Sequence, residues 1–380
     1  MKLAFIYDGV YPFTVGGFSK RIYDIARKLS ERGHEIHVYG MRLWDGPNTL
    51  LHNGFFIHGV CPTIRRYSGG KRTLSSALAF ASGILRALVR DGPFDIVDSG
   101  MAPIVHQPLA FLGARSCAKG FVITCVEVWT DYWYEYMGFP LGGIGIAAER
   151  LLVRLGDLVI AISEKIKREL ISLGLDVDRI RVVENGVDFE RIQRIRPVEE
   201  RYEVVFVGRL VPHKNVELLL KALRLLKADV PDVRCAIIGD GPERQKLEKM
   251  AYELGLAENV RFLGYLKDHD DVIAHMKAAR IFVLPSVREG FPNTVLEANA
   301  CGLPAVLVLH PKNAGAWVVK DGENGFRCRL SEHDIAAKIR LLLSDEGLLL
   351  KMRQRSLEFA GKHDWNIIVR KLEAVYNELI

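Results

Sequence analysis

The chain has 380 residues, 49% hydrophobic and 26% charged, a balance that excludes a disordered protein and allows two domains with buried cores. The net charge of +6 is spread evenly, with 25 Lys and Arg against 22 Asp and Glu in residues 1–200, so no nucleic-acid-binding domain is expected. The sequence has no apolar run of about 18 residues to span a membrane, and Met1–Asp8 lacks the apolar core of a signal peptide. These features predict a cytoplasmic protein.

A strand, a Gly-rich loop, a helix and a second strand open the chain. Lys2–Tyr7 is apolar and predicts the first strand, and Glu35–Tyr39 predicts the second. Between them, apolar residues at helical spacing predict a helix that ends at Gly33. Further strands are predicted at Phe94–Val97, Phe121–Val126 and Asp157–Ile162. This alternation is typical of a Rossmann-like, doubly wound parallel sheet.

Residues 61–90 differ from the rest of the chain in charge. They contain six basic residues and no acid, namely Arg65, Arg66, Lys71, Arg72, Arg86 and Arg90. The segment is either a surface that meets an anionic lipid or an anionic acceptor, or a solvated basic face.

The same pattern starts again after a proline-marked stretch, Arg194–Pro197. Glu203–Val207 predicts a new first strand, and Asn215 is expected to cap the helix that follows. Later strands are predicted at Val233–Ile238, Val260–Leu263, Ile281–Leu284 and Ala305–Leu309. We therefore expect a first domain at 1–195, a second at 196–364 with a cleft between them, and a helix at 365–380 that packs back on the first domain.

Polar motifs follow the predicted strands, at the sheet edge where such folds bind ligands. Gly16 and Gly17 are either an anion-binding approach to a helix or a tight turn. Arg209 and Lys214 bracket the turn after the strand at Glu203–Val207, where a diphosphate is their natural counter-ion. The chain has neither the full dinucleotide fingerprint nor a P-loop.

Two glutamates lie in the segment after the strand at Ile281–Leu284. Glu289 is expected on the loop, and Glu297 in the first turns of a helix capped by Asn293. Carboxylates at this edge can accept hydrogen bonds from sugar or ribose hydroxyls. Acids also favour helix N-termini for electrostatic reasons, which is the alternative explanation for Glu297.

Taken together, these motifs resemble the retaining GT-B glycosyltransferases of family 4. The similar residues are Gly16-Gly17, Asn185–Asp188, Gly208–Leu210 with Lys214, Gly239–Pro242, Glu289–Pro292 with Glu297, and Asp321–Phe326. The resemblance implies two Rossmann-like domains that face each other across a cleft. It also implies a nucleotide-sugar donor held mainly by the second domain and a glycan, lipid or small-molecule acceptor held mainly by the first.

The resemblance also implies roles for single residues. Arg209 and Lys214 would neutralise the donor diphosphate, and Glu297 would bind the ribose. Glu289, together with the amides near Phe291–Asn293, would recognise the donor sugar. The remaining donor-side residues implied are Gly16, Gly17, Gly208, Gly239, Gly290, Phe291, Pro292 and Asn293. Neither a metal nor a cofactor is implied.

The chain departs from the family after the strand at Phe121–Val126. Many relatives carry a histidine there, whereas this chain reads Thr124-Cys125-Val126-Glu127. Glu127 either takes over the polar role or is a surface acid. The aromatic residues that follow, from Trp129 to Tyr136, either cover a sugar ring or an apolar acceptor, or pack together.

The departure leaves other functions open. A non-catalytic subunit that binds a nucleotide sugar or a glycan, and a sugar-nucleotide epimerase, are the main alternatives. Six separated cysteines without a Cys-x-x-Cys motif are expected to be buried thiols and not a metal site.

Overall fold

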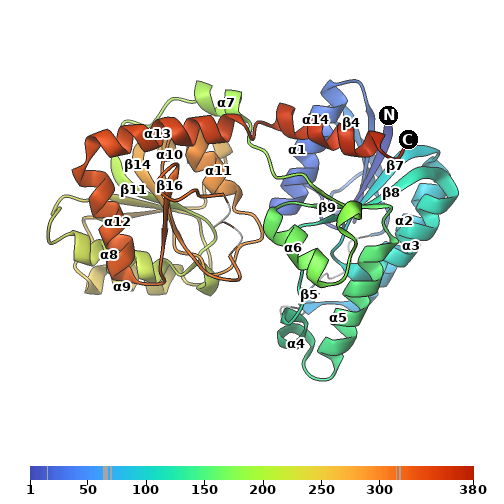
Figure 1. Ribbon diagram of the computed structural model, residues 1–380, viewed down its shortest axis with the longest axis horizontal. Coiled ribbons are helices and arrows are strands. Elements are labelled where there is room, and N and C mark those ends of the chain that lie inside the picture. Colours follow the sequence, from blue (N-terminus) through green and yellow to red (C-terminus); the bar gives the residue numbers. More distant parts are fainter. Residues whose placement is uncertain (15, 63–66, 69–70, 314, 316–317) are drawn as a thin grey trace. The chain divides into compact units, whose positions relative to one another are not determined.

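The computed structural model describes residues 1–14, 16–62, 67–68, 71–313, 315 and 318–380, and Figure 1 shows its helices and strands. The chain forms two compact units. Unit 1 contains Met1–Asn185 and Trp365–Ile380, and unit 2 contains Gly186–Asp364. The boundary therefore follows Asn185 and not residue 195, because helix α7 (Phe189–Arg194) lies in unit 2, where Ile192 joins the core and α7 packs on α11.

Unit 1 contains an eight-stranded sheet in the order β10-β9-β8-β7-β1-β2-β4-β3. All neighbours pair in parallel except β3 and β4. The strands are β1 (Lys2–Ile6), β2 (Glu35–Gly40), β3 (Thr49–His52), β4 (Phe55–Gly59), β7 (Phe94–Gly100), β8 (Ala118–Cys125), β9 (Leu158–Ala161) and β10 (Ile180–Val182). A separate antiparallel hairpin joins β5 (Tyr67–Ser68) and β6 (Lys71–Arg72).

The helices of unit 1 connect and cover these strands. They are α1 (Gly17–Glu31), α2 (Leu74–Asp91), η1 (Ile104–His106), α3 (Gln107–Cys117), α4 (Tyr132–Met137), α5 (Leu141–Leu152), η2 (Val153–Leu155), α6 (Glu164–Ser172), η3 (Val177–Arg179) and α14 (Trp365–Asn377). Helix α14 lies beside α1 and buries Trp365, Ile368 and Leu372 in the core of unit 1 (Figure 1). The closing segment of the chain is thus part of the first unit.

Unit 2 is a six-stranded, wholly parallel sheet in the order β13-β12-β11-β14-β15-β16. Its strands are β11 (Tyr202–Val207), β12 (Cys235–Ile238), β13 (Val260–Gly264), β14 (Ala279–Leu284), β15 (Ala305–Val308) and β16 (Gly325–Cys328). Its helices after α7 are η4 (Pro212–Lys214), α8 (Val216–Leu226), α9 (Arg244–Glu253), α10 (His269–Lys277), α11 (Asn293–Ala300), α12 (Glu332–Ser344) and α13 (Glu346–Gly361). The central strands are almost fully buried, as a sheet covered by helices on both faces requires.

Two local predictions need correction. Asn215 occupies the N-cap position of α8, but its backbone is left-handed (φ 53°) and its side chain makes no capping bond. Helix α11 begins at Asn293 itself, so Pro292 is its N-cap residue.

Of the six free thiols, five are buried and Cys117 is half-buried. Among the described residues, no helix combines the length and apolar character that a membrane span needs.

Candidate active site

The loops after β11 and β12 are joined through their backbones at the carboxyl edge of the unit 2 sheet. The amide of Gly208 donates to Ile238 O over 2.9 Å, and the amide of Leu210 donates to Asp240 O over 2.9 Å. Gly239 has a φ of +129°, and a Cβ at this position would lie 2.0 Å from Gly208 O. Only glycine therefore allows these two loops to meet.

Arg209 precedes η4 in the loop after β11, and Lys214 is the last residue of η4. Arg209 is exposed and makes no side-chain hydrogen bond or ion pair within the described part of the chain. Lys214 is mostly covered, and its Nζ lies 2.5 Å from Glu289 Oε1. Partial burial, followed by the charge of Lys214, lowers the pKa of His213 between them; Glu289 opposes this shift, and the three cations Lys214, Arg288 and Arg209 outweigh it. This edge of the sheet is therefore electropositive.

Glu289 is held in place by three segments that meet beside β14. Its amide donates to Lys312 O over 3.1 Å, and the amide of Val287 donates to His213 O over 2.9 Å. Asn313 is buried and donates to Ser286 O over 2.8 Å. The loop after β15 thus supports the glutamate. Sequence reasoning missed Asn313 because its role depends on a contact across the sheet.

The segment after Glu289 leads into the N-terminus of α11. Gly290 and Phe291 are half-buried, and Pro292 is buried. Asn293 opens the helix, and Glu297 lies in its second turn. Glu297 Oε1 is 3.1 Å from Nε2 of His269, the first residue of α10. Glu289 and Glu297 therefore have different partners, a lysine and a histidine.

In unit 1, Gly16 is the N-cap residue of α1 and Gly17 begins the helix. Gly16 is extended (φ −172°), a conformation open to any residue, so backbone strain does not require glycine there. No acidic residue lies in the first turn of α1, and its free amides point out of the helix. This end has the polarity that favours an anion.

Glu127 follows β8 and accepts a hydrogen bond from Trp129 Nε1 over 3.2 Å. Another acid, Glu149 of α5, lies close enough for Glu127 to contribute to the raised pKa of Glu149, whose main cause is burial. No local pattern in the sequence points to Glu149, because it belongs to a helix well beyond the motif.

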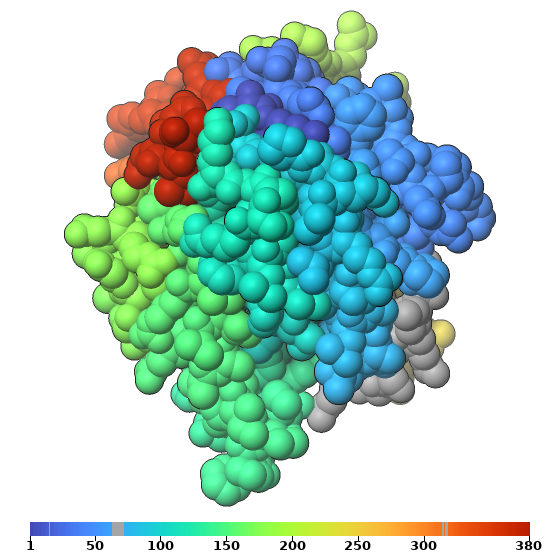
Figure 2. Space-filling model, turned by 90° about the vertical axis from the view of Figure 1, so that its right-hand side faces the viewer, coloured from blue at the N-terminus to red at the C-terminus, as the bar shows by residue number. Residues whose placement is uncertain are grey.

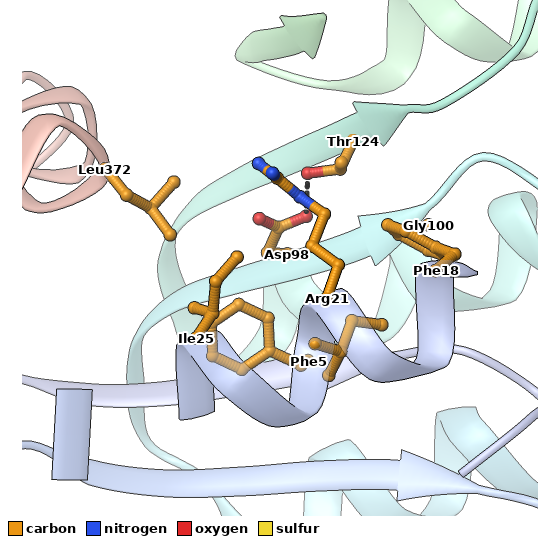
Figure 3. Close-up of a pocket in the computed structure, with 9 residues that line it drawn as sticks. Phe5, Phe18, Arg21, Ile25, Asp98, Gly100, Thr124 and Leu372 are labelled. Atoms are coloured by element: carbon orange, nitrogen blue, oxygen red, sulfur yellow. Dashed lines mark hydrogen bonds between the residues drawn. The ribbon is translucent and has the colours of Figure 1, made fainter. Parts of the chain in front are cut away.

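A separate buried cluster consists of Arg21, Asp98, Thr124 and Tyr376, and Figure 3 shows the first three of these side chains. Arg21, Asp98 and Thr124 line a cavity of about 10 Å³, which has room for one water molecule. Asp98 accepts hydrogen bonds from Thr124 Oγ1 (2.7 Å) and from the hydroxyl of Tyr376 (2.6 Å), while Arg21 donates to Val183 O and Glu184 O. Burial lowers the pKa of Arg21 to about 10 and raises that of Asp98. These hydrogen bonds link α1 to the segment after β10, and α14 to β7.

Within the described ranges, no group of three His, Cys, Asp or Glu side chains is arranged to hold a metal ion. The charged groups that could face a ligand in unit 2 are Arg209, Lys214, Arg288 and the two glutamates.

Comparisons with known proteins agree with this arrangement. A model of the glycosyl transferases group 1 family matches residues 188–359, and a model of glycosyltransferase family 4 matches residues 15–191. An uncharacterized glycosyltransferase of Methanocaldococcus jannaschii is 32% identical over 97% of this chain and 96% of its own. A D-inositol 3-phosphate glycosyltransferase of Geodermatophilus obscurus is 28% identical over 95% of this chain and 84% of its own.

The fold is shared with solved structures. The Anabaena protein HepE, in complex with UDP-glucose, matches with a TM-score of 0.76 and 19% identity over 100% of both chains. Two parallel-sheet units of this kind define the GT-B fold. The chain belongs to the glycosyltransferases of the group 1 family, enzymes of carbohydrate biosynthesis, which confirms the resemblance found in the sequence.

Proposed function

We propose that the protein transfers a hexose from a nucleoside-diphosphate sugar to a hydroxyl group, with retention of the anomeric configuration and without a metal ion. The observation that carries this proposal is the electropositive loop edge of unit 2, where Arg209 is exposed and Lys214 is paired with Glu289. The UDP-glucose complex of HepE and the glycosyltransferase relatives support a nucleotide-sugar donor.

The chemistry follows from where charge develops. Cleavage of the bond between the anomeric carbon and the phosphate oxygen leaves negative charge on the departing diphosphate. Cations such as Arg209 and Lys214 stabilise that charge, and they would replace a divalent ion. The acceptor hydroxyl attacks the same face of the sugar and gives its proton to the departing phosphate oxygen. Glu289 would hold the hydroxyls of the donor sugar, and Glu297 those of the ribose.

The test is a transfer assay on Arg209→Ala. Loss of a single contact to developing charge typically costs ~2.7–4 kcal/mol of barrier, so turnover should fall about 100- to 1000-fold. The stability of the fold should not change, because Arg209 is exposed and has no described partner. Arg234→Ala is the matched control, since that arginine is exposed in unit 2 and faces Glu203.

The assay uses UDP-, GDP-, ADP- and dTDP-sugars, with EDTA and then with Mg²⁺. Undiminished transfer by both Arg209→Ala and Glu289→Ala would refute the site. Binding of one donor without turnover would indicate a binding subunit, and interconversion of the donor would indicate an epimerase. Activity that requires Mg²⁺ would refute the metal-independent part of the proposal.

A peripheral contact with the inner face of the membrane through residues 61–90 is a further part of the proposal. Residues 63–66 and 69–70 lie outside the described residues. In α2, Arg86 is exposed on the same helix as Leu74 and Leu78, two exposed apolar residues. Co-sedimentation with phosphatidylglycerol vesicles should weaken at high salt and in Arg86→Glu. Binding that is absent, or that does not respond to salt, would refute an electrostatic contact.

A further inference from the structure

Four aromatic rings gather in the loop and short helix after β8. The ring centroid of Trp129 lies 4.7 Å from that of Trp133, 5.0 Å from that of Tyr132 and 5.0 Å from that of Tyr136. Only Trp133 is buried, whereas the other three are half-buried. Part of the cluster therefore faces solvent just beyond the carboxyl end of β8, the edge of unit 1 where a ligand is expected.

Glu149 fixes the backbone of this loop. Its side chain is buried, and Oε1 accepts the amide of Trp129 over 2.9 Å. Oε2 accepts the amide of Thr130 over 3.2 Å and the indole N–H of Trp133 over 3.1 Å. Thr130 has a φ of +40°, a conformation that a β-branched residue rarely adopts, and the bond to Glu149 holds it there. A buried carboxylate is thus used to set a loop conformation.

Helix α5 presses directly against the cluster. A Cβ on Gly145 would lie 2.5 Å from the ring of Trp133, and a Cβ on Gly142 would lie 2.5 Å from the ring of Tyr134. Two glycines on one face of the helix therefore allow α4 and α5 to pack closely and form the projection of unit 1 coloured green in Figure 2. The aromatic cluster has a rigid support.

Polar groups border the aromatic rings. Glu127 accepts the indole N–H of Trp129, and the hydroxyl of Tyr136 accepts the amide of Arg72 over 2.7 Å. A pyranose ring has the complementary chemistry, because its C–H face packs on an aromatic ring and its hydroxyls donate to carboxylates and tyrosines. A hydrocarbon chain offers no hydroxyl to these polar groups.

We propose that the segment Glu127–Tyr136 is the acceptor subsite and that it takes a sugar ring, with Trp129 as the stacking residue and Glu149 as a positioning residue. Glu149 acts through Trp129, since it fixes the backbone of the residue whose indole meets Glu127. The claim that the bound sugar is the acceptor rests on the proposed function. The claim that this segment binds a sugar does not, because sugar binding is measurable without a donor.

The first experiment measures tryptophan fluorescence of the full chain while methyl α-glucoside, methyl α-mannoside and methyl α-galactoside are added. Saturable quenching by at least one of them is expected, with affinity about tenfold weaker in Trp129→Phe. Tyr252→Ala, which removes an exposed tyrosine of α9 in unit 2, should bind like the wild type. Equal affinity in Trp129→Phe, or binding only of long-chain alkyl glucosides with no response to methyl glycosides, overturns the subsite.

The second experiment separates acceptor binding from donor chemistry in Glu149→Gln. The side-chain NH₂ group of the new glutamine would face N–H groups that need an acceptor, so Trp129 should move. The expected result is a shifted tryptophan emission and an acceptor KM raised about tenfold, with donor KM and donor hydrolysis by water unchanged. An equal loss of hydrolysis and transfer, or an unchanged acceptor KM in a folded variant, overturns the positioning role. A wild type that neither transfers nor hydrolyses any nucleotide sugar defeats the proposed function, while glycoside binding still decides the subsite.

Discussion

At the scale of single residues, the pair of Lys214 and Glu289 has two opposed effects on a nucleotide diphosphate. The lysine attracts it, while the glutamate, 2.5 Å away, neutralises the lysine. Glu289→Gln removes the neutralising charge but keeps the shape of the side chain. UDP, which has no sugar for Glu289 to hold, should then bind about fivefold more tightly, whereas sugar transfer should fall.

Calorimetry of UDP binding and a transfer assay on the same sample check this prediction. Glu203→Gln serves as the control, because Glu203 faces Arg234 elsewhere in unit 2. Weaker UDP binding in Glu289→Gln would show that the glutamate does not compete with the anion.

His58 gives a residue-scale prediction for pH dependence. Burial lowers its pKa from 6.5 to about 4, and its two ring nitrogens contact His37 and Thr49. As the pH falls below 6.5 the unfolded chain takes up this proton first, so stability should be lost between about pH 6.5 and 4 and change no further below. In His58→Gln, the slope of the unfolding free energy against pH in that window should be smaller, by up to the amount that the uptake of one proton contributes. Urea unfolding at several pH values measures it, and an unchanged slope contradicts the assignment.

The sequence indicates candidate site residues where they lie in the loop, or at the start of the helix, that follows an apolar strand. Arg209, Glu289 and Glu127 are candidates of this kind, because each lies in the loop after a recognisable apolar run. Glu149 and Asn313 were missed because they act through contacts between elements that are remote in the chain. The capping role of Asn215 was wrong because its left-handed backbone turns the side chain away from the capping geometry.

At the scale of elements, the interlocked loops after β11 and β12 depend on Gly239. Gly239→Ala would strain the backbone and place a Cβ 2.0 Å from Gly208 O, so it should cost about 3 kcal/mol of stability and weaken UDP binding. Gly255 is the matched control, since its φ is +69° but nothing lies within 4 Å of its Cβ, and Gly255→Ala should cost only about 1 kcal/mol. Denaturant unfolding of both variants measures the difference, and equal losses would show that the loop contact contributes nothing.

Strand prediction succeeded or failed according to burial and length. The fully buried strands β11, β14 and β15 read as continuous apolar runs and were predicted within two residues of their ends. The edge strand β3 alternates between exposed and half-buried residues, and β5 and β6 have two residues each, too short for a periodic signal. Strands β4, β10 and β16 were also missed, because each contains a polar or charged residue, His58, Arg181 or Arg327, that interrupts a short apolar run.

At the scale of the whole molecule, the chain leaves unit 1 after Asn185 and returns to it at Trp365. A single buried cluster holds both connections. Arg21 donates to Val183 O, to Glu184 O and to the side chain of Asn185, while Asp98 accepts the hydroxyl of Tyr376 in α14. Arg21 lies in α1, one turn beyond Gly16-Gly17. The hydrogen bonds that hold the chain where it leaves unit 1 therefore also hold the helix end that favours an anion.

Tyr376→Phe tests whether this cluster fastens the returning helix. The change removes a 2.6 Å hydrogen bond and leaves a buried carboxylate with one donor fewer, so unit 1 should lose about 1.5–3 kcal/mol. Tyr252→Phe is the control, since Tyr252 is 76% exposed on α9 of unit 2. Because the expected nucleotide site lies mainly in unit 2, saturating UDP should raise the unfolding temperature of wild type and variant by the same amount. A smaller UDP-induced shift in Tyr376→Phe would mean that the anchor of α14 also supports nucleotide binding, and a stability equal to that of wild type would mean that the apolar face of α14 fastens it alone.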